Sequence, residues 1–86
     1  MEFKIVIVND QNEYKLNVKL IWYDDVFEHY QVTGRNKSII LETNRRLLFK
    51  KGLKHKPPTW KLIEGQGYNM GILEKIQQEI LKAVSF

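Results

Sequence analysis

The chain has 86 residues, of which 43% are hydrophobic and 28% charged, and its net charge is +4. A chain of this length builds one modest core, so we expect residues 1–86 to form a single domain of ordinary globular composition, not a disordered chain. It contains no cysteine, which excludes disulfides, thiol nucleophiles and thiolate metal sites, and we expect a cytoplasmic location. No apolar run approaches the ~20 residues that cross a bilayer, and the first residues lack the features of a signal peptide, so no membrane insertion is predicted.

Two strands joined by a hairpin are predicted at the start of the chain. Residues 3–8 alternate and are rich in β-branched side chains, and residues 9–12 favour a turn. The alternation is clearest over residues 13–23. One face of this second strand carries Tyr14, Leu16, Val18, Leu20 and Trp22. We therefore expect this face, Trp22 included, to be buried.

The first strand differs from the second because it is apolar on both faces. Phe3, Ile5 and Ile7 lie on one side, and Val6 and Val8 lie on the other. A strand of this kind is either central in its sheet or half of a subunit interface. A central position is the simpler interpretation, and the interface would instead give a dimer through the open face or an edge of the sheet.

Two further strands are predicted over residues 26–33 and 38–43, each preceded by a turn-forming segment, Asp24-Asp25 and Gly34-Arg35-Asn36 respectively. The segment that follows is ambiguous. Asn44 could cap a two-turn helix that Gly52 terminates, whereas residues 47–49 could instead form a short strand. We favour a turn or a short helix.

A loop, a last strand and a helix are predicted in the remainder of the chain. Two prolines make residues 53–58 an extended or irregular surface loop, and residues 59–64 form a strand with Trp60 and Leu62 on one side. Apolar residues then recur at helical spacing, opposite a charged face, at Ile72, Leu73, Ile76, Ile80, Leu81 and Val84. The predicted fold is α+β, a mainly antiparallel sheet of four to five strands with one C-terminal amphipathic helix packed on one face. The other face stays open to water, a ligand or another subunit.

The positive charge of the chain is confined to one block. Nine Lys and Arg residues fall between Arg35 and Lys61, with Glu42 as the only acid among them, whereas the segments on either side are net acidic. Cations neutralise phosphates and exposed rings stack on bases, so this block predicts contact with nucleic acid. The expected contact residues are Arg45, Arg46, Lys50, Lys51, Lys54, Lys56 and Lys61, with Trp60 and Tyr23 as stacking residues. The competing interpretation is a solvated lysine loop with Trp60 in the core.

Three kinds of chemical site were weighed against simpler interpretations. Gly65, Gly67 and Gly71 between a strand and a helix could present backbone N–H groups to an anion, but their spacing is not that of a phosphate-binding motif and favours a plain turn. A metal site at Asp24, Asp25, Glu28 and His29 is disfavoured because Glu28 and His29 point to opposite faces of a strand. No serine or carboxylate pair has the context of a catalytic group, so no enzyme, cofactor or metal is expected.

No stretch of the chain carries a motif specific to one family. The sequence therefore predicts a small, non-enzymatic binding domain that contacts nucleic acid through residues 35–61. The alternative is a protein-interaction module or homodimer that uses the open sheet face. A third hypothesis, an anion-binding enzyme at the turn from Gly65 to Gly71, predicts that a small phosphorylated ligand raises the melting temperature.

Overall fold

The computed structural model describes residues 1–84, which form one antiparallel sheet and two helices. In chain order the elements are β1 (Glu2–Asn9), β2 (Asn12–Tyr23), β3 (Glu28–Thr33), β4 (Ser38–Thr43), α1 (Arg45–Lys50), β5 (Trp60–Glu64) and α2 (Met70–Val84). The strands lie in the order β1-β2-β3-β4-β5, so each pairs with its neighbour in sequence. This is the α+β architecture that the sequence predicts.

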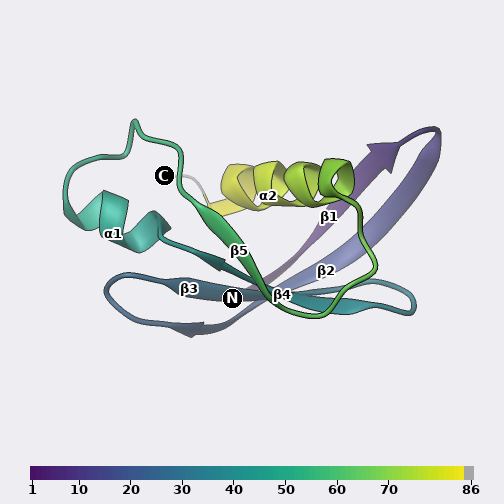
Figure 1. Cartoon of the computed structure of the whole chain (residues 1–86), viewed down its shortest axis with the longest axis horizontal. Helices are drawn as coiled ribbons and strands as arrows, with labels where there is room; N and C mark the ends of the chain where they lie inside the picture. Colours follow the sequence, from purple (N-terminus) through teal and green to yellow (C-terminus); the bar gives the residue numbers. More distant parts are fainter. Residues whose placement is uncertain (85–86) are drawn as a thin grey trace.

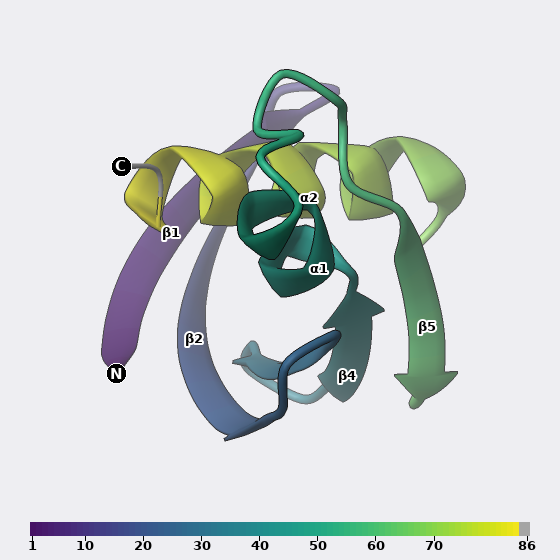
Figure 2. The same ribbon diagram turned by 90° about the vertical axis from the view of Figure 1, so that its left-hand side faces the viewer.

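The sheet is strongly curved, and α2 lies across its concave side (Figures 1 and 2). The apolar face of α2 is buried there, through Ile72, Leu73, Ile76, Ile80 and Val84. The sheet contributes alternate residues of its strands to the same core, namely Ile5, Ile7, Leu16, Val18, Tyr30, Val32, Ile39 and Leu41. The convex side carries no helix in either view, as expected when one amphipathic helix covers one face.

The position of β1 corrects the simpler expectation for this strand. It lies at the edge of the sheet, not at its centre. Short connections join β1 to β4 into a meander, in which the first strand has a partner on one side only. Val6 and Val8 point away from the core and are 49% and 58% exposed, respectively. The second apolar face of β1 is therefore exposed to solvent.

A β-bulge in β2 corrects the prediction for Trp22. Leu20 pairs with Tyr30, but Trp22 pairs with His29, the residue just before Tyr30 in β3, because the register shifts between Leu20 and Trp22. Successive residues of a strand face opposite sides, so the extra residue moves Trp22 from the concave to the convex face. The side chain that alternation assigns to the core is thus exposed.

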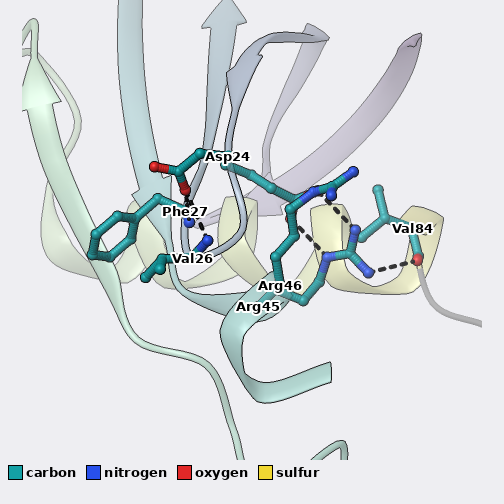
Figure 3. Close-up of polar contacts among 7 residues, drawn as sticks. Asp24, Val26, Phe27, Arg45, Arg46 and Val84 are labelled. Carbon is teal, nitrogen blue, oxygen red and sulfur yellow. Dashed lines mark hydrogen bonds and ion pairs between the residues drawn. The ribbon is translucent and has the colours of Figure 1, made fainter. Parts of the chain in front are cut away.

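The third strand begins two residues later than predicted, at Glu28. The Asp24 carboxylate accepts hydrogen bonds from the backbone N–H groups of Val26 and Phe27, at 2.8 and 2.7 Å. These bonds hold residues 24–27 in a turn, as Figure 3 shows, and lower the pKa of Asp24.

Neither described helix is both long enough and apolar enough to cross a membrane.

Candidate functional site

A loop of nine residues, 51–59, follows α1 at one end of the sheet (Figure 1); we call it the basic loop. Gly52, the second residue of the loop, has φ of 72° and stops α1 from continuing beyond Lys50. The N–H of Gly52 donates to the Phe49 carbonyl at 3.1 Å, and that of Leu53 donates to the Leu48 carbonyl at 2.7 Å. Left-handed glycine is the common way to end a helix, so the helical interpretation of this segment is confirmed, with Gly52 as its end.

Asn44 precedes α1, but its side chain does not cap the helix. Its Oδ1 instead accepts a hydrogen bond from the N–H of Thr59 at 2.8 Å. The bond joins the residue before α1 to the last residue of the basic loop. The two ends of the loop are thereby held together, as in an Ω-loop. Its two prolines have no N–H to donate, so they prevent regular backbone hydrogen bonding within the loop. A second bond, from the Leu47 N–H to the Val26 carbonyl at 3.3 Å, ties α1 to the turn before β3.

Arg45, predicted to contact nucleic acid, forms an internal ion pair. Its Nε and Nη2 donate to the two carboxylate oxygens of Glu28, both at 2.8 Å, and the two side chains are only 15% and 1% exposed. Its Nη1 donates to the Val84 carbonyl at 3.4 Å, at the end of α2 (Figure 3). Burial lowers the pKa of Arg45, but the hydrogen bonds and charge of Glu28 outweigh it and raise the pKa overall. Arg45 therefore ties α1 to β3 and α2.

The same network includes Tyr30, a fully buried residue of the core. Burial raises the pKa of Tyr30 to about 12, and the negative charge of Glu28 adds to the rise. A neutral phenol thus lies beside a buried carboxylate, whose charge Arg45 balances. This end of the core is polar but electrically compensated.

Arg46 divides its contacts between the interior and the surface. Its guanidinium lies over the Tyr23 ring, 4.0 Å from the centroid, and its Nε is 3.5 Å from Glu28 Oε2. Two arginines thus share one carboxylate. Arg46 remains more than one-third exposed, and Tyr23 is exposed beside it. A cation stacked on an exposed ring is suited to contact a phosphate or a base.

The lysines of α1 and the basic loop form the accessible part of the site. Lys50 lies 3.4 Å from Asp25, but both side chains are exposed, and pairs of this kind are weak. Lys51, Lys54 and Lys56 are also exposed, and none makes an ion pair with an acid within residues 1–84. Lys54 Nζ lies 5.2 Å from the centroid of the Phe49 ring. The structure therefore gathers four predicted lysines at one end of the sheet.

The two remaining predicted residues lie on β5. Lys61 is exposed and pairs in register with Glu42 of β4, so it lies on the convex face and not in the basic loop. Trp60 is half-buried and packs against the core, with its ring centroid 6.4 Å from that of Tyr30. This placement agrees with the core interpretation of Trp60. Within residues 1–84, Tyr23 and Phe49 have exposed rings at this end.

A cavity of about 430 Å³ lies between α1, the basic loop and α2. Its apolar walls come from Leu48, Phe49, Pro57, Pro58 and Leu81, and its polar lining comes from Arg45, Lys54, Lys56 and His55. Sequence reasoning missed both Phe49 and this use of Leu81, which the helical spacing assigns to the core. The structure leaves Leu81 half-buried because it faces the basic loop, not the concave sheet.

The convex face carries a row of side chains that sequence reasoning also missed. His29 Nε2 lies 2.9 Å from Glu42 Oε2, and the His29 ring lies 4.5 Å from that of Trp22, centroid to centroid. Glu28 points into the core, so neighbouring positions of β3 face opposite sides, as predicted. No cluster of three metal-ligand residues occurs among residues 1–84.

The glycine segment before α2 forms a turn. Gly65 and Gly67 have φ of 91° and 113°, which L side chains rarely adopt. Asn69 Oδ1 accepts a hydrogen bond from the Ile72 N–H at 2.9 Å, and Lys37 Nζ donates to the Gly67 carbonyl at 2.6 Å. The start of α2 is thus capped by a side chain of the protein itself. This geometry favours the plain β-to-α turn over an anion site.

Comparisons with protein-family models, curated proteins and solved structures found no match to this chain. The functional argument therefore rests on the chemistry of α1 and the basic loop.

Proposed function

We propose that this protein is a small, non-enzymatic domain that binds nucleic acid through α1 and the basic loop. One observation supports the proposal above the others. Lys50, Lys51, Lys54 and Lys56 are gathered at one end of the sheet beside the exposed rings of Tyr23 and Phe49. Lys51, Lys54 and Lys56 make no ion pair with an acid within residues 1–84, and the pair of Lys50 with Asp25 is exposed and weak. Their charges can therefore neutralise phosphates, and the adjacent rings offer stacking surfaces.

The structure divides the predicted contact residues by availability. Arg45 donates hydrogen bonds from Nε and Nη2 to Glu28. We therefore assign it a role in positioning α1 and not a phosphate contact. Arg46 is assigned a phosphate contact beside Tyr23. Lys61 extends the basic surface onto the convex face.

We also propose a cytoplasmic location, with which the cysteine-free composition is compatible.

The proposal is tested by fluorescence anisotropy with labelled single-stranded DNA, duplex DNA and RNA, at several salt concentrations. The test variant replaces Lys50, Lys51, Lys54 and Lys56 with alanine. A control with the same net charge replaces four exposed lysines elsewhere, Lys4, Lys15, Lys19 and Lys82. We expect binding at micromolar concentration or tighter in the wild type and the control, and a large loss in the test variant.

The salt dependence gives an independent readout. Four lost phosphate contacts reduce the slope of log affinity against log salt by about 3 on a single strand. Equal losses in the two variants would attribute binding to net charge alone and contradict the assigned site. Binding seen only at low salt would reduce the basic loop to a solvated surface.

A second candidate function rests on the edge position of β1. This strand has eight residues, and its convex side exposes Val6 and Val8. Edge strands present unpaired backbone groups that pair readily with another strand. We propose as the alternative a homodimer joined along β1, in which Val6 and Val8 of the two copies lie side by side on the open sheet face.

Sedimentation velocity tests this alternative. A dimer at micromolar concentration that persists at high salt and dissociates in Val6→Lys would support it, since an apolar interface responds weakly to salt and a lysine at an edge opposes pairing. A wild-type monomer at these concentrations would contradict it.

A further inference from the structure

The cavity between α1, the basic loop and α2 combines apolar walls with positive charge. Phe49 is 46% exposed, and Pro57 and Pro58 line the cavity from the basic loop. Proline fixes its own backbone angle, so this wall is stiffer than an ordinary loop. A volume of about 430 Å³ lies within the range of small-ligand sites. The space is therefore suited to a flat apolar group.

The charges around the cavity limit the chemistry of that group. Lys54, His55 and Lys56 line it together with Arg45, and no acid is among the residues of 1–84 that line it. Arg45 is compensated by Glu28, but Lys54 and Lys56 have no acidic partner within residues 1–84. Lys54 and Lys56 are exposed, so their charges meet a ligand where it leaves the apolar walls. The occupant must join an apolar ring to negative charge.

A nucleic-acid strand offers this combination in a repeated form. Each base is flanked by phosphates on both sides, and cations of the basic loop and of α1 lie near the same cavity. Figure 2 shows α1, the basic loop and α2 side by side at one end of the sheet. A base within a duplex is stacked and paired, and its extrusion costs free energy that an unpaired base does not pay.

We infer that this cavity binds one unpaired base, between Phe49 and the Pro57-Pro58 wall, while Lys54 and Lys56 contact the flanking phosphates. The inference rests on the proposed function and adds a preference to it: single strands bind more tightly than duplexes because only they release a base into the cavity. The basic loop then distinguishes single strands from duplexes by binding a base, and not by charge alone.

Anisotropy with two labelled single strands of equal length tests the inference. One is oligo-thymidine, and the other is an abasic strand with the same phosphates and no bases. We expect the base-containing strand to bind the wild type about tenfold more tightly, since stacking of one base contributes at this level. Phe49→Ala removes most of this ratio and leaves the affinity for the abasic strand unchanged, because it deletes a ring and no charge.

Trp22→Ala is the matched control, since Trp22 is an aromatic residue of the same exposure, 46%, on the convex face. It should leave the ratio unchanged, and circular dichroism should show that both variants are folded. If Trp22→Ala and not Phe49→Ala abolishes the ratio, the base lies on the convex face and the inference is overturned.

Two further outcomes separate the inference from the proposed function. Equal affinity for both strands overturns the inference and leaves phosphate binding by the lysines intact. Binding to neither strand overturns the inference, and the proposed function fails with it only if duplex DNA and RNA also do not bind. A labelled acidic peptide that contains phenylalanine provides the last arm. If it binds as tightly as oligo-thymidine and loses affinity in Phe49→Ala, the occupant is a peptide and the base assignment fails.

Discussion

The two ends of the sheet carry similar side chains but use them differently. One end is formed by α1 and the basic loop. The other, which we call the far end, is formed by residues 34–37 and 65–69 and holds a cavity of about 460 Å³. There, Lys37 Nζ donates to the Gly67 carbonyl at 2.6 Å and lies 5.1 Å from the centroid of the Tyr68 ring. The far-end cavity is also lined by an acid, Glu13.

The comparison shows that a count of cations does not locate a binding surface. At the far end the ammonium group of Lys37 is used to fix the turn before α2. At the α1 end the structural role falls to Arg45, which is paired with Glu28, and this leaves Lys54 and Lys56 available. A binding surface needs charges that the fold itself does not use. The predictions below test this division of roles.

The largest effect on stability is expected from Glu28→Gln, which removes the ion pair at the α1 end. The change removes the buried carboxylate that Arg45 and Arg46 share. Loss of one partner of a buried pair costs about 3–5 kcal/mol in the free energy of unfolding. Urea denaturation measures this cost. Glu42→Gln, on the solvent side of β4, is the control and should cost less than about 1 kcal/mol. Similar costs for both would show that the buried pair does not anchor α1.

An alkaline titration of stability should give the next largest effect. Tyr30 has a pKa near 10 in the unfolded chain and about 12 in the folded protein. Between these values the unfolded state loses the phenol proton and the folded state keeps it, so stability falls as pH rises from 10 to 12. The expected loss is about 2–3 kcal/mol. Below pH 10 the phenol is neutral in both states and contributes no pH dependence.

Substitutions of the tyrosines at the two ends sharpen this test. Tyr30→Phe should remove most of the loss between pH 10 and 12. Burial also raises the pKa of Tyr68 at the far end, and the charge of Tyr14 adds to the rise, but Tyr68 is only half-buried. Tyr68→Phe should therefore change the alkaline profile less. A profile that depends more on Tyr68 than on Tyr30 would contradict the assignment of the buried polar network to the α1 end.

Much of the fold could be predicted from local patterns. Alternation located the strands, helical spacing located α2, and the glycine after α1 marked its end, because each of these depends on a few neighbouring residues. The bulge in β2 could not be predicted in this way. One inserted residue reverses the face of Trp22, and its position is fixed by pairing with β3, which lies outside the local pattern.

The candidate site was predicted in part, for a different reason. The lysines of the basic loop were identified from charge alone, but charge does not reveal which cations have internal partners. One signal was available for Arg45. Glu28 shares a strand face with Tyr30 and Val32, so it should be buried, and a buried carboxylate requires a cation. Neither the charge of the basic loop nor the alternation of β3 indicates the cavity, because α1, the basic loop and α2 meet there only in the folded chain.

The smallest effects are expected from single lysine substitutions at the two ends, and they test the division of roles most directly. Lys37→Ala removes a hydrogen bond and a ring contact, so it should lower stability by about 1 kcal/mol and leave nucleic-acid affinity within about twofold of the wild type. Lys54→Ala should do the reverse, with a severalfold loss of affinity and a change in stability within about 0.5 kcal/mol. Urea denaturation and anisotropy on the same samples measure both quantities. If both substitutions lower affinity equally, the two ends act as one diffuse positive surface. If Lys54→Ala lowers stability and leaves affinity unchanged, the basic loop serves the fold in the same way as the far end.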